Sequence, residues 1–297
     1  MNQTARALGA GLAVLALVTA CGSVEQAKTP AESASPPSSS PSPPEPRRGP
    51  GYVALGDSFT AGGPIGTLQE QGLRCQRSSR NYPSVVATTL DLPLTDVSCV
   101  GATSASLLGA EPGAPAQIDA ITPRTRVVTI GVGGNDFGLY RTLLLTCPDI
   151  SKPESRGAPC KNRLGRQVAS SVPSIDDTVG EVLAAVNRRA PGADVLLVGY
   201  PRLMPPSGTC SAAPYAKGDI AWISSTESAL SATLAAAARA HDVTYVPMYR
   251  HSKGHDLCAG NAGWVNGLDP PTGDGHVLHP NAAGERAIAA AVVKALR

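Results

Sequence analysis

Three polar segments of the 297-residue chain carry side chains whose types could together perform chemistry on a carbonyl group. Asp57 and Ser58 follow one apolar run after a single glycine, Asn135 follows another run, and His279 lies just ahead of the last helical pattern. A serine hydroxyl becomes a nucleophile when a neighbouring histidine accepts its proton. An asparagine amide can donate to the oxyanion that then develops. These residue types are therefore typical of nucleophilic catalysis, provided that the fold brings them together.

Gly101 is a further candidate, because it follows a predicted strand, Val97–Val100, and a glycine lets a backbone N–H approach a ligand closely. Taken alone, each of these residues is equally compatible with an ordinary turn or helix cap. A dinucleotide-binding loop is a competing interpretation of Gly131 and Gly133. It fails because Asp136 stands where the third glycine belongs.

His276 and His279 could also suggest a metal site. No third ligand stands at a matching spacing, so we expect no metal at these residues. We also expect no cofactor.

The elements that must position these residues alternate along the chain. Strands are predicted at Tyr52–Leu55, Val97–Val100, Arg126–Val132, Asp194–Val198 and Val243–Val246. Helical spacing of apolar residues recurs over residues 168–186, with the helix start predicted near Pro173, and over residues 223–237 and 288–296. Alternation of this kind predicts a parallel sheet covered by helices on both faces, with its chemistry at the carboxyl ends of the strands.

Two stretches, Thr142–Arg166 and Tyr200–Lys217, break this alternation, and we expect them to be irregular loops tied down by cysteines. After Cys21 the chain holds six cysteines and no CxxC pair. An even number outside the cytoplasm predicts three disulfides, while the connectivity stays open on this count alone.

The N-terminal segment predicts export. Residues 1–20 contain Arg6 followed by an apolar run too short to span a bilayer, as in a signal peptide. Residues 18–21, Val-Thr-Ala-Cys, resemble a bacterial lipobox, in which Cys21 would be lipidated; an ordinary cleaved signal is the alternative. Residues 21–50 are rich in proline and serine and predict an extended linker. Residues 51–297 then form one α/β domain.

The chain carries a net charge of +2 and 16% charged residues. No basic stripe interleaved with aromatic residues is present, so nucleic acid is a poor candidate partner.

The order Ser, Gly, Asn, His resembles that of the SGNH (GDSL-type) hydrolase family. Residues 56–59, Gly-Asp-Ser-Phe, match its first block, with Phe59 in place of the usual leucine. Gly101 matches the second block, residues 133–136 the third, and residues 279–281, His-Pro-Asn, the last. The four blocks span nearly the whole of the domain. The cysteine placement resembles the secreted bacterial branch that includes lipases and phospholipases A1.

The resemblance implies a three-layer α/β/α sandwich with a central parallel, flavodoxin-like sheet. It implies that Ser58 is the nucleophile and His279 the base, and that Ser58, Gly101 and Asn135 form the oxyanion hole. It also implies disulfides between sequence neighbours, namely Cys75–Cys99, Cys147–Cys160 and Cys210–Cys258.

One position departs from the family pattern. Most members carry an aspartate three residues before the histidine, where this chain has His276. A backbone carbonyl near His276 could hold the His279 tautomer instead, while Asp274, five residues away, is a weaker substitute. The identity of a third catalytic member therefore stays open.

We expect a monomeric serine esterase or lipase that hydrolyses acyl esters of lipids or small acyl esters outside the cytoplasm, anchored to the cell membrane through Cys21 or secreted. The alternatives are an acyltransferase, an acetyl-glycan esterase of the cell envelope, and a non-catalytic envelope-binding lipoprotein.

Overall fold

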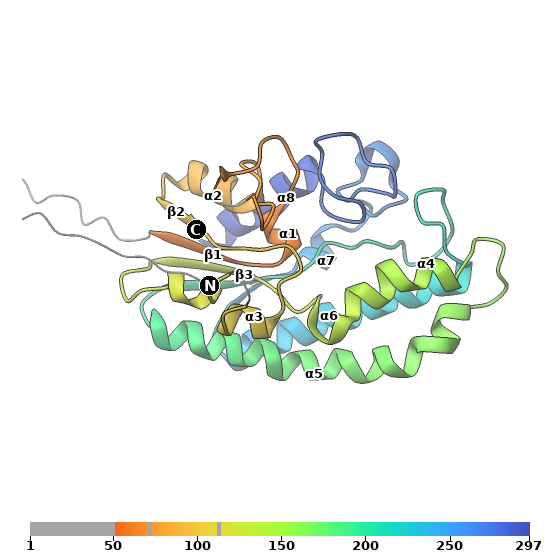
Figure 1. Cartoon of the computed structure of the whole chain (residues 1–297), viewed down its shortest axis with the longest axis horizontal. Coiled ribbons are helices and arrows are strands. Elements are labelled where there is room, and N and C mark those ends of the chain that lie inside the picture. The colour runs from red at the N-terminus through yellow and green to blue at the C-terminus, as the bar shows by residue number, and fades with distance from the viewer. Residues whose placement is uncertain (1–50, 71–72, 112–113) are drawn as a thin grey trace, which may run out of the picture. The chain divides into compact units, whose positions relative to one another are not determined.

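A computed structural model describes residues 51–70, 73–111 and 114–297. Within these residues five strands form one sheet in the order β2-β1-β3-β4-β5, with every neighbouring pair parallel (Figure 1). The strands are β1 Tyr52–Gly56, β2 Leu94–Asp96, β3 Val127–Gly131, β4 Asp194–Val198 and β5 Thr244–Val246. The predicted central parallel sheet is confirmed. In this strand order a ligand crevice opens at the carboxyl ends of β1 and β3, where the winding direction reverses.

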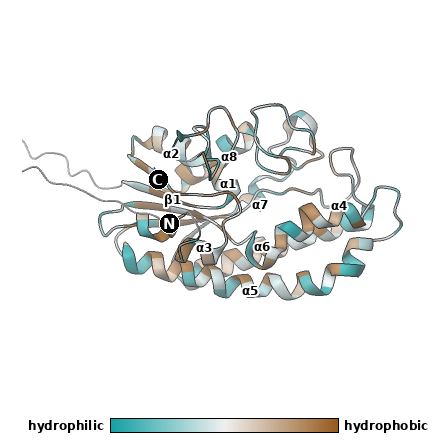
Figure 2. Cartoon of the chain, in the orientation of Figure 1, coloured by the Kyte–Doolittle hydropathy of each residue, from teal (hydrophilic) through white to brown (hydrophobic). Residues whose placement is uncertain are grey.

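Both faces of the sheet are buried, which explains why β1 is apolar throughout. Val53 and Leu55 belong to one hydrophobic cluster, whereas Tyr52 and Ala54 belong to a second cluster on the opposite face. A strand covered on both sides cannot alternate apolar with polar residues. Figure 2 shows the same distribution, with hydrophobic central strands and mixed hydropathy along the outer helix α5.

Helices cover the two faces of the sheet, with α3, α5 and α6 on one side and α2 and α8 on the other (Figure 1). The α-helices are α1 Ser58–Ala61, α2 Tyr82–Leu90, α3 Ser104–Leu108, α4 Cys147–Ile150, α5 Pro159–Arg189, α6 Lys217–Ala240, α7 Met248–His251 and α8 Ala282–Ala295. Short 3-10 helices are η2 Gln117–Ala120, η3 Asp136–Gly138 and η5 Gly260–Ala262, and η4 Arg141–Thr146 is a π-helix. In the described part of the chain, none of these helices is both long enough and apolar enough to cross a bilayer.

The predicted start of α5 was wrong. The helix begins at Pro159 and continues through Pro173. Proline removes one backbone donor and leaves the carbonyl four residues earlier without its partner. Pro173 and Ala169 are both exposed, so water can bind the freed carbonyl. A proline inside a long helix is tolerated on this outer face.

Two other sequence-based predictions were also wrong in part. The strand predicted at Val97–Val100 lies at Leu94–Asp96 instead. Beyond it, the N–H groups of Val97 and Cys99 still donate to Ala54 and Gly56, so the chain follows β1 without forming a regular strand. The stretch Thr142–Arg166, predicted as irregular, is largely helical, because it contains most of η4, all of α4 and the start of α5.

Three disulfides join residues that are neighbours among the cysteines: Cys75–Cys99, Cys147–Cys160 and Cys210–Cys258. These are the pairs that the family resemblance implies. The first holds the segment before Gly101, and the second ties α4 to the first turn of α5. Disulfides form and persist in oxidising compartments, which places the folded domain outside the cytoplasm.

Candidate active site

Ser58 is held at the carboxyl end of β1 by a very tight turn. Asp57 caps α1, its carboxylate accepting the Phe59 N–H at 2.9 Å, and Ser58 is the first residue of the helix. The turn requires Gly56, because a Cβ there would lie 2.2 Å from the Thr60 hydroxyl and 2.7 Å from a carbonyl of β3. The Ser58 side chain is thereby presented at the crevice edge of the sheet with little freedom to move.

His279 reaches Ser58 from a loop more than two hundred residues away. Its Nε2 lies 2.7 Å from the Ser58 Oγ. Asn266 holds this loop: its backbone N–H donates to the His279 carbonyl, and its side-chain amide donates to the carbonyls of Asp274 and His276. Asn266 is buried and was missed by the sequence analysis, because an asparagine in an irregular segment carries no signal.

The other nitrogen of His279 is bound by the backbone. Nδ1 lies 2.7 Å from the Val277 carbonyl, so it carries the proton and Nε2 is left as an acceptor. Leu278 stands between them with a φ of 58°, and this left-handed turn points the carbonyl back at the imidazole. The Asp274 carboxylate is used elsewhere, because it accepts the N–H of Ala282 at the start of α8. Asp274 is therefore not the partner of His279.

The environment of His279 favours the neutral imidazole. Burial, reinforced by the nearby His276, lowers the pKa of His279 to about 4, although the Val277 carbonyl acts in the opposite direction. The Phe59 ring lies 4.7 Å from the imidazole, centroid to centroid, and covers part of it. A neutral histidine at ordinary pH can accept a proton, as a general base must.

The expected oxyanion donors line the same cavity as the Ser58–His279 pair. In the described part of the chain the N–H groups of Ser58 and Gly101 donate to no protein acceptor. Gly101 has a φ of 81°, which a residue with a side chain rarely adopts. The Asn135 amide donates one hydrogen to the Ala102 carbonyl at 3.0 Å, which leaves its second hydrogen for a ligand.

Asp136 holds the segment that follows Gly101 in place through two hydrogen bonds. One of its carboxylate oxygens accepts the Ser104 N–H at 2.8 Å, and the other accepts the Thr178 hydroxyl at 2.6 Å. The aspartate thereby ties the first residue of α3, three positions after Gly101, to α5. Its position beside Asn135 means that one short motif supplies both the Asn135 amide and the contact that holds the start of α3.

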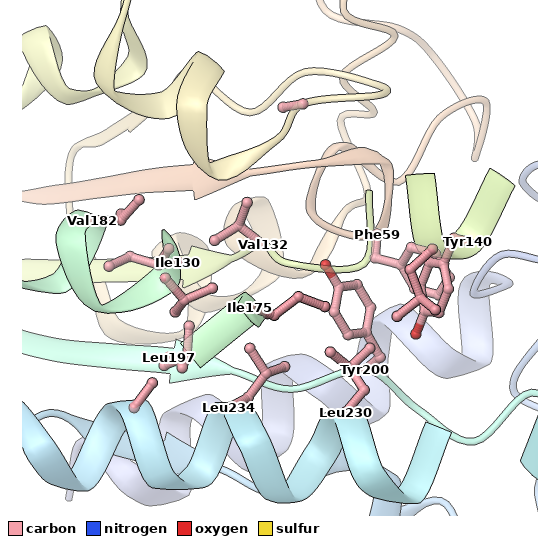
Figure 3. Close-up of a cluster of buried hydrophobic side chains, with 14 of the residues drawn as sticks. Phe59, Ile130, Val132, Tyr140, Ile175, Val182, Leu197, Tyr200, Leu230 and Leu234 are labelled. Atoms are coloured by element: carbon pink, nitrogen blue, oxygen red, sulfur yellow. The ribbon is translucent and has the colours of Figure 1, made fainter. Parts of the chain in front are cut away.

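A second buried carboxylate links three strand ends. Asp57 accepts the Tyr200 hydroxyl at 2.6 Å, and the same hydroxyl accepts the Gly134 N–H at 2.8 Å. Burial raises the pKa of Asp57 to about 7, against the effect of these hydrogen bonds. Figure 3 shows Tyr200 with Phe59 and Tyr140 at one end of the buried cluster. Tyr200 was also missed, since a tyrosine in a loop gives no sign of this contact.

The cavity that contains Ser58 and His279 has a volume of about 470 Å³ and is mostly apolar. Its remaining lining residues are Phe59, Val100, Gly101, Thr103, Asn135, Gly138, Tyr140, Arg141, Leu144, Leu145, His276, Val277 and Leu278. A somewhat larger cavity of about 520 Å³ adjoins it at Val100 and Gly101 but contains neither Ser58 nor His279. The described residues include no cluster of three or more side chains suited to a metal ion.

A parallel five-stranded sheet that presents a serine and a histidine at hydrogen-bond distance defines a serine-dependent hydrolase of the α/β class. The sequence matches the profile of the GDSL-like Lipase/Acylhydrolase family over residues 54–287. The chain belongs to this family and is a carboxylic ester hydrolase. The family and the fold class expected from the four sequence blocks are confirmed.

Individual relatives agree with this assignment. The chain is 36% identical to Lipase 2 of Streptomyces coelicolor over 252 residues, which cover 80% of this chain and 83% of that protein. A crystal structure of phospholipase A1 from Streptomyces albidoflavus NA297 superposes with a TM-score of 0.68 at 28% identity, covering 82% of this chain and 97% of the other. The extracellular lipase of Streptomyces rimosus gives the same TM-score at 27% identity and the same coverage.

Proposed function

We propose that Ser58 is the nucleophile and His279 the general base of an esterase that acts through an acyl-enzyme. The observation that carries the proposal is the 2.7 Å contact between Ser58 Oγ and His279 Nε2 inside the apolar cavity. The proton on Nδ1 is held by the Val277 carbonyl, so Nε2 is free to accept the hydroxyl proton.

In the acylation step, Nε2 takes the Ser58 proton as Oγ attacks the carbonyl carbon of the ester. The tetrahedral oxyanion receives hydrogen bonds from the Ser58 and Gly101 N–H groups and the Asn135 amide. The imidazolium then protonates the leaving alkoxide as the C–O bond breaks, and the acyl group stays on Ser58. Water, deprotonated by the same imidazole, attacks the acyl-enzyme and releases the carboxylic acid.

The cavity supports an acyl ester of a lipid, or a small acyl ester, as the substrate. Leu144, Leu145 and Tyr140 offer apolar surface to an acyl chain next to the reacting serine. The relatives named as lipases and as a phospholipase A1 support the same class. All the proposed catalytic groups come from one chain, so we propose that the monomer is active.

The N-terminal segment, residues 1–50, lies outside the described residues. We propose that residues 1–20 are a signal peptide, that Cys21 is lipidated, and that residues 21–50 tether the hydrolase domain to the membrane. Several acyl chains are needed for stable anchoring. Cys21→Ala is expected to move the protein from the membrane fraction to the soluble fraction; continued membrane fractionation would contradict the anchor.

The catalytic proposal is tested by labelling with a fluorophosphonate probe, followed by peptide mapping. We expect the label on Ser58, and no label after Ser58→Ala. A panel of p-nitrophenyl esters of increasing chain length then measures the preferred acyl group. A protein that hydrolyses these esters but carries its label on another serine would refute the role of Ser58.

A further inference from the structure

Gly56, the last residue of β1, joins the sheet to the turn that presents Ser58 two residues later. Toward β3 the backbone pairing continues past Gly56, because the Asp57 N–H donates to the Gly131 carbonyl at 2.9 Å. Toward β2 it is interrupted, since that strand ends at Asp96. In a regular parallel ladder the Gly56 N–H would donate to a carbonyl of the neighbouring strand. Gly56 is buried, so its N–H needs another acceptor.

The side chain of Gln117 supplies this partner. Its Oε1 accepts the Gly56 N–H at 2.8 Å, and its Nε2 donates to the Gly56 carbonyl at 3.0 Å. A side-chain amide carries the same donor and acceptor as a peptide group, so Gln117 takes the place of a strand residue beside β1. Gln117 is only 6% exposed, and both hydrogen bonds are buried. The pair holds the end of β1 on the side where β2 no longer does.

The Gly56 carbonyl also connects the two segments that carry the proposed nucleophile and an oxyanion donor. It accepts the Cys99 N–H at 3.0 Å in addition to the Gln117 amide. Cys99 precedes Gly101 by two residues, and Gly56 stands at the same spacing before Ser58. One carbonyl oxygen, with both of its lone pairs used, therefore joins the serine segment to the Gly101 segment.

Gln117 is itself held by the core of the domain. It is the first residue of η2, and the next residue, Ile118, is 3% exposed within the larger hydrophobic cluster. Asp119, on the same short helix, forms an ion pair with Arg189 of α5 at 2.9 Å. Gln117 does not line the cavity that contains Ser58, so any effect of its side chain on the reaction acts through the residues that it holds.

We propose that Gln117 is a positioning residue, whose amide holds the Ser58 nucleophile and the Gly101 N–H at the separation that the tetrahedral oxyanion requires. The inference rests on the proposed function. The nucleophile and the oxyanion donors must all reach one reacting carbonyl group, and a displacement of about 1 Å can lower a rate about a hundredfold. Loss of the Gln117 amide should therefore lower kcat. It should leave KM nearly unchanged, because the apolar cavity that binds the ester does not include Gln117.

The test uses two variants whose side chains are similar in size to glutamine. Gln117→Met removes both hydrogen bonds, and we expect kcat on a short p-nitrophenyl ester to fall about ten- to a hundredfold. Gln117→Glu keeps an acceptor for the Gly56 N–H, but it can donate to the Gly56 carbonyl only while its carboxyl group is protonated. Burial raises the pKa of such a carboxyl group above its usual value of about 4.3. We therefore expect kcat of Gln117→Glu to be close to native at pH 5 and to approach that of Gln117→Met at pH 9.

Asn187→Leu is the matched control. The Asn187 side-chain amide also donates to a backbone carbonyl, that of His241 at 2.8 Å, but it does so between the C-terminal ends of α5 and α6. This variant should lose unfolding free energy in urea and keep the native kcat. Each variant is compared with the native protein at the same pH, because all the proteins share the ionisable residues that line the cavity beside Gln117: Arg74, Arg77, Glu111 and Asp119.

The native kcat in Gln117→Met would overturn the inference, as would a Gln117→Glu protein that is no more active at pH 5 than Gln117→Met. Lower stability with an unchanged kcat per labelled Ser58 would also overturn it, because the amide would then support only the fold. If Gln117→Met does not fold, Gln117→Glu alone decides, and equal kcat at pH 5 and pH 9 overturns the inference. Absence of fluorophosphonate label on Ser58 of the native protein would instead contradict the proposed function.

Discussion

Ser58 and His279 meet at 2.7 Å, yet the two segments that carry them are held by different kinds of contact. On the serine side, the ends of β1 and β3 are fixed by two buried carboxylates, Asp57 and Asp136, each of which accepts two hydrogen bonds. On the histidine side, the described residues place no carboxylate against the imidazole, and its Nδ1 lies 2.7 Å from the Val277 carbonyl oxygen.

The difference shows which contacts hold each of the two side chains in position. Buried carboxyl groups whose oxygens accept hydrogen bonds hold the groups around them in place, because breaking such a network leaves buried polar groups without partners. Ser58 and the proposed oxyanion donors therefore lie beside a sheet edge that these hydrogen bonds hold in place. The histidine needs only the correct tautomer and a neutral ring, which a carbonyl and an apolar environment can supply.

Removal of either reacting group should have the largest effect. We expect Ser58→Ala and His279→Ala each to lower kcat on a soluble ester by about 10⁴–10⁶, and the double variant to be little worse, because the two act as one unit. Ser170→Ala, at an exposed position on α5, is the control and should retain full activity. Near-native turnover in Ser58→Ala would contradict the assignment.

The second-largest effect is expected when the Asn135 amide, the proposed oxyanion donor, is removed. Asn135→Ala is expected to lower kcat by about 10²–10³ with little change in KM, because the amide acts mainly on the transition state. Steady-state kinetics on a p-nitrophenyl ester separates the two constants. A change in KM alone would mean that Asn135 binds substrate or only shapes the turn.

The hydrogen bonds of Asp136 can be tested separately. Asp136→Ala leaves the Ser104 N–H without its acceptor, and we expect a loss of about 1–3 kcal/mol in unfolding free energy together with a roughly tenfold or larger loss of kcat. Asp136→Asn retains an acceptor oxygen and should lose less of both. Urea denaturation and kinetics on the same preparations measure the two effects. Equal kcat in all three proteins would show that the contact does not position the oxyanion donors.

Sequence patterns were informative where chemistry imposes residue types, and weak where contacts depend on the folded chain. The buried strand β4 was predicted to the residue, and the blocks around Ser58 and Asn135 follow strands, because a sheet covered on both faces needs continuous apolar runs. Tyr200 and Asn266 could not be predicted, because their roles depend on loops that meet only after folding.

The pH dependence tests the environment of His279. Because the pKa of His279 is lowered to about 4, the imidazole stays mostly neutral down to about pH 5, and its protonation should halve the activity near pH 4. A histidine of usual pKa, about 6.5, would be mostly protonated at pH 5. We therefore expect kcat/KM on a short-chain ester at pH 5 to stay close to its value at pH 7. An acid limb centred near 6.5 would show that the ring is more hydrated than the structure implies.

The smallest effects are expected at the two residues nearest to the position of a third catalytic member. Asp274→Asn retains a side-chain oxygen that can accept the Ala282 N–H at the start of α8, and Asp274 makes no contact with the His279 ring among the described hydrogen bonds. His276→Ala removes a ring that lies edge-on to His279, with 5.6 Å between the two ring centroids. Each should lower kcat by less than about tenfold, or ~1.4 kcal/mol. Loss of a true third carboxylate can cost about 10⁴, because the wrong histidine tautomer then dominates.

The two variants should nevertheless differ in their pH profiles. His276 contributes to the lowered pKa of His279, so His276→Ala should move the acid limb upward, toward the usual value, while Asp274→Asn should leave it in place. The measurement is kcat/KM against pH for both variants, with circular dichroism to verify folding. A thousandfold loss in a folded Asp274→Asn protein would mean that the carboxylate moves to His279 during the reaction. The two sides of the site would then be alike, since both would depend on a carboxylate.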